Sequence, residues 1–411
     1  MLRVPTSERG KKTYQKILKS AISLFRKRGY QEVSVSSICK EAEVGNSTFY
    51  QYFSTKDDVL KEIVEDLFRL IEESVKRSIG SYSLSKSERL KIFLKDFFDT
   101  IYNDIDKYAV FRNAEFLNPE ISHEFHDNMY AIFANSLFPE AENEISKRAA
   151  FIFIIGAAHF VITEYGIYKG IKPPEYAHDT VFDFLYNGLD PDDHMISPEA
   201  FVIIEPAKPT FKLLSRGSLT HQKLLDAAEE MFGEKGYSKA KISDIADKAG
   251  VGLGTFYIHF NSKIEALREL VVRTLEGLKS NLRRYVSRFE DRRDAEVAGY
   301  LGFCDFFKHH ENMYSIVRET EFVDPQTANF YYSSISKSYI HPLEKAFESN
   351  EYRKLMPEPL SYALMGIGHL MGQFLLVQND AEMSDCVEYI REISKLLMHG
   401  LKGFVEAQNG L

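Results

Sequence analysis

The sequence has few of the residues that build a disulfide-rich or zinc-stabilised protein. Its 411 residues include only three cysteines, Cys39, Cys304 and Cys386, with no CxxC pair and no histidine at metal-ligand spacing from any of them. We therefore expect no disulfide framework, no metal and no cofactor. A chain of this kind suits a reducing compartment, and we expect a cytoplasmic protein.

Long hydrophobic runs are also missing. The longest, residues 151–162, contains His159 and stops well short of the roughly 20 residues that cross a bilayer. No basic segment followed by an apolar one opens the sequence, so we expect no signal peptide and no membrane partner. The run 151–162 is interpreted as a buried helix.

Motifs of catalysis are absent as well. The sequence shows no glycine-rich phosphate loop, no metal-spaced cluster of His, Asp and Glu, and no GxSxG. We therefore name no catalytic residue and do not expect an enzyme.

Alternation typical of β-strands is scarce, whereas helical periodicity is common. In the first half Tyr14, Ile17, Leu18 and Ala21 recur at the spacing of one buried helix face, and residues 224–232 repeat that pattern. The expected fold class is all-α.

The chain also repeats itself. "GNSTFYQYFSTKDDVL" from Gly45 returns as "GLGTFYIHFNSKIEAL" from Gly252, and residues 29–60 share 13 of 32 positions with residues 236–267. Weaker echoes follow, such as "FRNAEFLNP" at Phe111 and "VRETEFVDP" at Val317. A period of about 200 residues indicates two copies of one domain-sized unit.

Four prolines between Gly188 and Lys212 mark the junction of the copies, because proline cannot sit in a helix interior. Within it the apolar residues 201–204 are either a short strand or an apolar strip laid on the surface. We predict a first head at 1–60, a first body at 61–190, a linker at 191–212, a second head at 213–267 and a second body at 268–411.

Positive charge gathers in the two repeated segments. The whole chain carries a net charge of −9, yet residues 1–61 hold twelve Lys and Arg against six Asp and Glu, and residues 208–268 hold ten against seven. Two basic segments on an acidic body favour two local contacts with a polyanion.

The sequence of each basic segment predicts two short helices joined by a break of three to four residues. In the first copy these are a helix around Val35–Ala42 and a second from Asn46 to Tyr52, and the second copy has the same layout. A helix-turn-helix places its second helix in the DNA major groove. Ordinary packing is the alternative for one such pair, but the repetition on basic segments favours DNA binding.

These residues carry a family resemblance. A first helix ending in "RGY" or "KGY", a helix-turn-helix closing on "TFYxxF", and a lysine opening the next helix resemble the TetR family of transcriptional regulators. The resemblance implies a three-helix head, a ligand pocket in a helical body, and dimerisation through the last two helices of each unit. It also implies an operator of double-stranded DNA. The family usually has one unit per chain, whereas this chain has two.

We predict DNA contacts from both second helices and the start of the helix that follows. The first head supplies Asn46, Ser47, Thr48, Tyr50, Gln51, Tyr52 and Lys56. The second supplies Leu253, Thr255, Tyr257, Ile258, His259 and Lys263. The phenylalanines between them are expected to hold each second helix on its neighbours.

Lys56 and Lys263 each follow a capping-box pattern, Thr55-x-x-Asp58 and Ser262-x-x-Glu265. A lysine in the first turn opposes the helix dipole, and a DNA phosphate docked there would reverse that penalty. A solvated surface lysine is the alternative.

Aromatic residues concentrate in both bodies and suggest pockets for a small hydrophobic effector. The predicted ligand residues are Phe97, Phe98, Tyr102, Phe111, Arg112 and Phe116 in the first copy, and Phe306, Phe307, Tyr314, Arg318 and Phe322 in the second. Alternatively, the aromatic rings only pack in the core. Arg112 and Arg318 could likewise form only intrahelical ion pairs, with Glu115 and Glu321 respectively. His159 and His369 are expected in the core or at an interface.

The sequence therefore predicts a ligand-responsive repressor in which two fused TetR-like units pair as a pseudo-dimer and release the operator on binding a fatty acid or acyl thioester. An activator or an architectural DNA-binding protein without effector is the alternative. Two chains could also pair each copy with its twin, or the second head could serve only as an interface.

Overall fold

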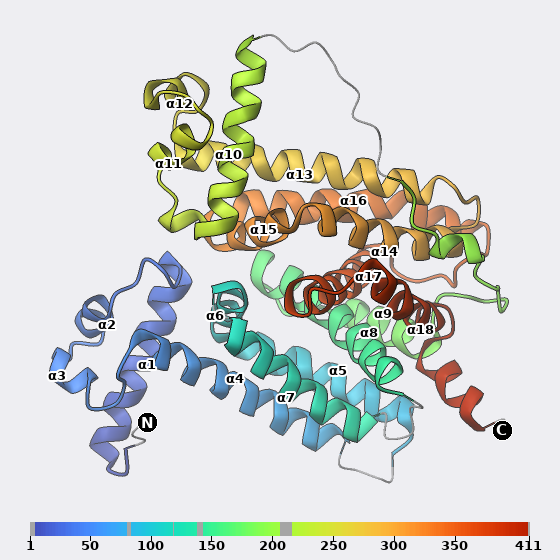
Figure 1. Cartoon of the computed structure of the whole chain (residues 1–411). Coiled ribbons are helices and arrows are strands. Elements are labelled where there is room, and N and C mark those ends of the chain that lie inside the picture. The colour runs from blue at the N-terminus through green and yellow to red at the C-terminus, as the bar shows by residue number, and fades with distance from the viewer. Residues whose placement is uncertain (1–4, 80–83, 118, 138–142, 206–215, 410–411) are drawn as a thin grey trace. The chain divides into compact units, whose positions relative to one another are not determined.

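The computed structural model describes residues 5–79, 84–117, 119–137, 143–205 and 216–409. Every regular element in these ranges is a helix (Figure 1), which confirms the all-α prediction. By its internal contacts the chain divides into two compact units, residues 1–139 with 165–172, and residues 140–164 with 173–411.

The first unit contains the first head and part of the first body. Its helices are α1 (Glu8–Arg28), α2 (Val35–Glu41), α3 (Asn46–Phe49), α4 (Lys56–Ile79), α5 (Lys86–Asn103), α6 (Ile105–Leu117) and α7 (Pro119–Leu137). Tyr14, Ile17, Leu18 and Ala21 are buried on one face of α1, as the periodicity predicts. Helix α4 continues from the head into the body, where α5, α6 and α7 pack on it.

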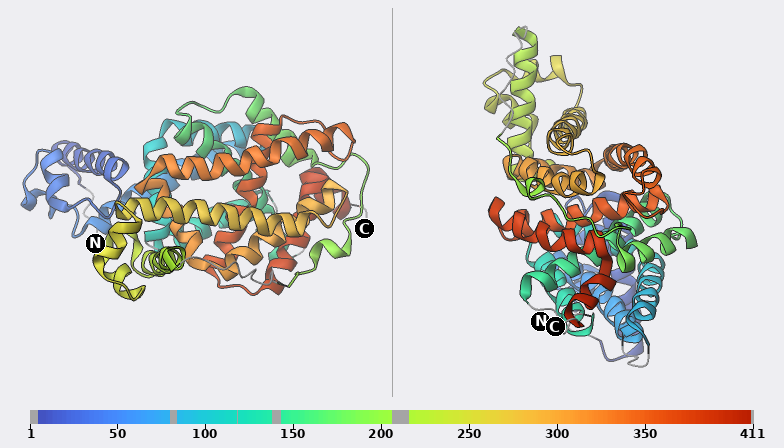
Figure 2. Two further views of the ribbon diagram at one scale, coloured as in Figure 1. Left: turned by 90° about the horizontal axis from the view of Figure 1, so that it is seen from above. Right: turned by 90° about the vertical axis from the view of Figure 1, so that its right-hand side faces the viewer.

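The second unit contains the whole second copy and two helices of the first. Its elements are α8 (Glu144–Ile162), α9 (Glu175–Asn187), η2 (Pro198–Phe201), α10 (Arg216–Lys239), α11 (Ile242–Lys248), α12 (Leu253–His259), α13 (Lys263–Val286), α14 (Arg292–His309), α15 (Glu311–Val323), α16 (Pro325–Glu348), α17 (Pro357–Gly372), η3 (Gln373–Gln378) and α18 (Met383–Asn409). A further π-helical turn, η1 (Thr163–Tyr168), continues α8. Helices α13 and α16 run side by side along the body (Figure 2).

The last two helices of each copy meet inside the second unit. Helix α8 packs along α17, α9 packs on α18 and α17, and α18 also contacts α8. At the crossing of α8 and α17 the two backbones touch, since a Cβ built on Gly156 would lie 2.8 Å from the Gly366 carbonyl oxygen. One chain thus brings the two copies together, and the predicted body 61–190 is divided between the units.

Two helical stretches, Glu144–Tyr168 and Pro357–Gln378, are long and apolar enough to cross a membrane by length and composition alone. Their most apolar windows are 94 % and 78 % buried inside the protein. The core helices of soluble proteins meet the same criteria.

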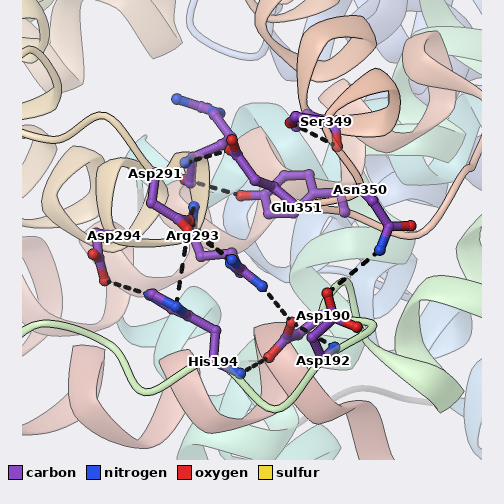
Figure 3. A network of polar contacts seen from close by, with 12 residues as sticks. Asp190, Asp192, His194, Asp291, Arg293, Asp294, Ser349, Asn350 and Glu351 are labelled. Atoms are coloured by element: carbon purple, nitrogen blue, oxygen red, sulfur yellow. Dashed lines mark hydrogen bonds and ion pairs between the residues drawn. The ribbon is translucent and has the colours of Figure 1, made fainter.

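The structure describes the linker up to Glu205, and a polar network ties its first part and the preceding Asp190 to the start of α14 (Figure 3). Arg293 donates to Asp190 at 2.8 Å, and Asp294 accepts from the Ser197 backbone at 2.8 Å. Further on, the Tyr285 hydroxyl accepts from the Ile204 backbone at 3.3 Å. The apolar residues 201–204 form a surface strip rather than a strand. Residues 206–215, which include the end of the predicted linker and the start of the predicted second head, lie outside the described ranges.

Candidate DNA-binding heads and ligand cavity

The first head has the predicted helix-turn-helix. Ser34 caps α2 and forms a reciprocal capping box with Ser37, and Glu43 takes a positive φ of 50° in the turn before α3. Helix α3 ends at Phe49, shorter than the predicted 46–52. The cause is local, because the N–H groups of Gln51 and Tyr52 bond three residues back instead of four.

Most of the predicted contact residues of the first head lie on its surface. Asn46, Ser47, Tyr50 and Gln51 are exposed, while Thr48 is half-buried. Tyr52 differs from the rest, because its ring packs edge-on against Tyr14 of α1 at 5.9 Å. The sequence could not separate Tyr50 from Tyr52, since only the neighbouring helix shows which ring turns inward.

The second head presents a more apolar surface from the equivalent helix. Leu253, Tyr257 and Ile258 of α12 are exposed, with 79 % of Ile258 accessible to solvent. Thr255 is half-buried, and so is His259, whose ring lies 5.4 Å from that of His221. As predicted for both heads, the phenylalanines are buried: Phe49, Phe53, Phe256 and Phe260. The two heads therefore share a scaffold and differ in the groups that they expose.

Both capping lysines have partners that the sequence did not reveal. Lys56 Nζ donates to the Tyr30 carbonyl at 2.8 Å and lies 4.1 Å from the centre of the Tyr30 ring. Lys263 Nζ repeats this arrangement, donating to the carbonyls of Tyr237 at 2.6 Å and Ala240 at 2.9 Å. Burial lowers the pKa of Lys56. Each lysine ties its helix to the end of the first helix of the head, and the phosphate contact stays a prediction.

The predicted capping box is confirmed in the first copy, while the second copy forms only its N-cap half. Asp58 accepts from the backbone of Thr55 at 2.9 Å, and Thr55 Oγ1 accepts from the Asp58 backbone at 3.1 Å. In the second copy Ser262 caps α13 in the same way, while Glu265 reaches back to the Asn261 backbone at 2.7 Å. Helices α4 and α13 consequently begin at equivalent residues, Lys56 and Lys263.

Replacing Lys263 by methionine should destabilise the second head by about 1–3 kcal/mol, because buried carbonyls lose their donor while the apolar stem is kept. We expect faster amide hydrogen exchange at residues 237–241 and a lower midpoint of urea unfolding. The control is Lys239→Met, which replaces an exposed lysine at the end of α10, close in sequence to the carbonyls that Lys263 contacts. Unchanged stability together with a salt slope of DNA binding reduced by about one would instead support a phosphate contact.

The second body contains an apolar cavity that is partly open to solvent, and its volume of about 640 Å³ includes that open space. It lies among α13, α14, α15, α16 and α17, and Phe160 of α8 adds a wall from the first copy. Half of its lining residues are aromatic: Phe160, Tyr300, Phe303, Phe307, Tyr314, Tyr331, Tyr332, Tyr339 and His369.

The structure brings three of the five ligand residues predicted in the second copy to this cavity, namely Phe307, Tyr314 and Arg318. Phe306 is absent from the lining, and its ring packs on His310 at 4.7 Å. Phe322 is half-buried and does not line the cavity either. Both point away because α14 and α15 each turn only one face toward the cavity.

The ligand residues predicted in the first copy are buried or half-buried wherever the structure describes their side chains. Phe97, Phe98, Phe111 and Arg112 are buried, and the Phe111 ring lies 4.0 Å from that of Phe125. Tyr102 is half-buried, and the side chain of Phe116 lies outside the described residues. A smaller pocket of about 290 Å³ between α4 and α7 includes none of them in its lining. Their role in ligand binding remains a prediction.

Polar groups of the cavity are mostly engaged with one another. Glu321 pairs with Arg318, as the intrahelical alternative predicts, and also accepts from the Tyr332 hydroxyl at 2.6 Å. The Tyr314 hydroxyl lies 3.0 Å from Nδ1 of His369. The His159 and His369 rings are stacked 6.3 Å apart where α8 meets α17. The prediction that both histidines belong to the buried interface is confirmed.

The sequence did not single out several lining residues, among them Tyr300, Tyr339 and Phe160. On α14 Phe303 lies one turn and Tyr300 two turns before Phe307, so helical spacing from Phe307 could have suggested them. Phe160 carried no such signal, because it comes from the other copy.

Comparison with known proteins agrees with the geometry of the heads. The family model described as "Bacterial regulatory proteins, tetR family" matches residues 17–63 and 224–270. Each match runs from the first helix of a head into the first turns of α4 or α13. The two copies recognised in the sequence are thus two matches to one family.

The HTH-type transcriptional activator FasR of Mycolicibacterium smegmatis is 36 % identical over 106 residues, 26 % of this chain and 48 % of FasR. The chain therefore spans about half the length of that relative. The uncharacterized HTH-type transcriptional regulator YdgC of Bacillus subtilis is 25 % identical over 191 residues, 44 % of this chain and 95 % of YdgC. The solved structure of Bacillus subtilis FadR in complex with stearoyl-CoA has 18 % identity and a TM-score of 0.41, covering 44 % of this chain and 98 % of that one. All three are named as regulators.

Proposed function

We propose that this chain, which belongs to the TetR family and carries the DNA-binding domain of that family twice, grips one operator with two unlike heads. The observation that carries the proposal is the packing of α8 and α9 on α17 and α18 within one chain. In TetR-like proteins the last two helices of each subunit form the dimer interface. One chain of this protein supplies both halves of such an interface, so a single molecule takes the place of a dimer.

The two heads would read different half-sites. Asn46, Ser47 and Gln51 expose groups that donate and accept hydrogen bonds at base edges. Leu253 and Ile258 expose only apolar side chains, which suit contacts with thymine methyl groups. A homodimer with identical heads prefers a palindrome, whereas a fused pair is free to bind an asymmetric site.

Selection of operators from random DNA should yield an imperfect or non-palindromic site, with one chain per duplex by native mass spectrometry. Gln51→Ala should relax the base preference at one position by about 1–3 kcal/mol. Ile258→Ala, the control in the other head, should alter specificity less, because it loses only an apolar contact. A perfect palindrome bound by two chains would refute the single-chain proposal.

The effector is proposed to be a hydrophobic acid or its thioester, bound in the cavity of the second body. Support comes from the aromatic lining, and from relatives, since Bacillus subtilis FadR was solved with stearoyl-CoA. The effector must favour a conformation that DNA rejects, because equal affinity for both states shifts nothing. Release from the operator then makes the protein a repressor, acting in the cytoplasm.

Thermal denaturation with a panel of fatty acids and thioesters separates this proposal from an architectural protein without an effector. A compound that binds only the folded state raises the melting temperature by mass action. The same compound should release the operator in a mobility-shift assay. If a compound raises the melting temperature but does not release the operator, the proposed repressor mechanism is wrong.

A further inference from the structure

A second cavity adjoins the aromatic one. This outer cavity opens to solvent, and its volume of about 980 Å³ includes the open space. Four residues line both cavities: Leu282, Gly299, Ile335 and Tyr339. The remaining lining of this outer cavity is largely polar or charged: Lys279, Arg283, Ser287, Arg292, Glu296 and Ser338. Both cavities are largely apolar in surface, and the outer one adds charged side chains at its rim, so that together they suit a ligand with an apolar part and a charged part.

The outer cavity carries excess positive charge. Arg292 and Glu296 form an ion pair and neutralise each other. Lys279 and Arg283, one turn apart on α13, have no carboxylate within ion-pair distance among the residues that the structure describes. Like charges at this spacing repel. Burial and the neighbouring Arg283 both lower the pKa of Lys279. An anion between the two cations would remove that repulsion.

We propose that Lys279 and Arg283 bind the phosphate-bearing head group of an amphiphile whose apolar tail occupies the aromatic cavity. The inference rests on the proposed effector site and specifies the chemistry of its ligand. A single carboxylate would compensate one of the two cations, whereas a phosphate monoester carries a charge of about −1.5 to −2. An arginine can donate two parallel hydrogen bonds to two oxygens of one phosphate, and a lysine adds a positive point charge.

The inner cavity offers one phenol to the ligand. Of its five tyrosines, Tyr300 donates to the Leu364 carbonyl at 2.9 Å, Tyr339 donates to Glu296 at 3.1 Å, and Tyr314 and Tyr332 are engaged with His369 and Glu321. Tyr331 is 97 % buried, and the described part of the chain provides no hydrogen-bond partner for it. Its hydroxyl would donate to a carbonyl oxygen of the bound ligand.

The test compares three probes that share one acyl chain. Palmitoyl-coenzyme A carries phosphates, palmitoyl-pantetheine is a thioester without them, and palmitate has only a carboxylate. Calorimetry on the full chain at physiological salt should show palmitoyl-coenzyme A binding at least about 10-fold more tightly than palmitoyl-pantetheine. That advantage should shrink as salt is raised, because Arg283 is exposed.

The double variant Lys279→Gln, Arg283→Gln should lower the affinity for palmitoyl-coenzyme A about 10- to 100-fold. Its affinities for palmitoyl-pantetheine and palmitate should stay within about twofold of those of the unmodified protein. The control, Lys337→Gln with Lys345→Gln, removes two exposed lysines of α16 that line neither cavity. Tyr331→Phe should lower the affinity for both thioesters equally, because the lost hydroxyl would contact the carbonyl that both share and not the phosphates.

Equal binding of palmitoyl-coenzyme A by the double variant and the unmodified protein would overturn the head-group site. So would equal affinity of the unmodified protein for the two thioesters. If palmitate still binds and releases the operator in either case, the proposed function stands and only the head-group site fails. If no probe binds the unmodified protein, the effector proposal and the head-group site fail together.

Discussion

Replacing Gly366 by alanine should destabilise the protein by about 3 kcal/mol or more, because the new methyl group has no room. A Cβ built at this position overlaps the Gly156 carbonyl oxygen and lies 2.6 Å from the Phe160 Cβ. The first obstacle is backbone, so no rotamer change relieves it, and α8 must move away from α17. Urea unfolding followed by circular dichroism measures the loss.

Gly254→Ala is the matched control. Gly254 also lies in a helix, α12, but a Cβ there meets nothing within 4 Å. Alanine should then stabilise the helix by about 0.5–1 kcal/mol, because glycine loses more backbone freedom on folding. Equal effects of the two substitutions would mean that α8 and α17 do not touch at Gly366.

A double-mutant cycle with Gly156→Ala tests whether the copies pair within one chain. If Gly156 faces Gly366, both methyl groups strain one crossing, and the cost of the double variant falls short of the sum of the single costs. If two chains pair each copy with its twin, the glycines belong to separate crossings and the costs should add. Additivity would therefore favour an assembly of two chains with four heads.

The heads and the fold class were predictable because their signals are local and occur twice. The turn before α3, the caps of α4 and α13, and the buried phenylalanines depend on residues a few positions apart. Helical periodicity likewise depends on residues three to seven positions apart. Because the unit occurs twice, a pattern seen in one copy could be checked in the other.

Contacts between distant residues could not be predicted in this way. The phosphate contact of Lys56 stays a prediction, but nothing in the sequence places the Tyr30 carbonyl beside its ammonium group. Cys304 and Cys386 seemed unrelated, yet both are buried, and a thiol contact with Cys386 raises the pKa of Cys304 well above its ordinary value. Such pairs depend on how helices pack, which one sequence does not specify.

The sequence predicted an aromatic cavity but only some of the residues that line it. Aromatic content predicted pockets in both bodies, but which rings face a cavity depends on the rotation of each helix, and Phe306 and Phe322 do not line the cavity of the second body. The outer cavity was missed because Lys279 and Arg283 look like ordinary surface cations of an amphipathic helix until their neighbours are known.

Replacing Glu321 by glutamine should cost about 3–5 kcal/mol of folding stability, because it takes the negative charge away from a buried arginine. Arg318 is 1 % exposed and pairs with Glu321 three residues further along α15. Glutamine keeps the shape of glutamate and still offers an oxygen to the Tyr332 hydroxyl, so the loss comes mainly from the charge. Chemical unfolding at neutral pH provides the measurement.

Glu8→Gln is the control with the same three-residue spacing, since Glu8 pairs with Lys11 at 3.2 Å while 83 % of its side chain is exposed. Solvent screens that pair, and its loss should cost less than about 1 kcal/mol. Arg318 also lines the aromatic cavity, so an anionic ligand should recover part of the stability lost in Glu321→Gln. Palmitate should then raise the unfolding midpoint of this variant more than that of the unmodified protein. A loss no larger than that of Glu8→Gln would show that Arg318 does not depend on Glu321 for its charge balance.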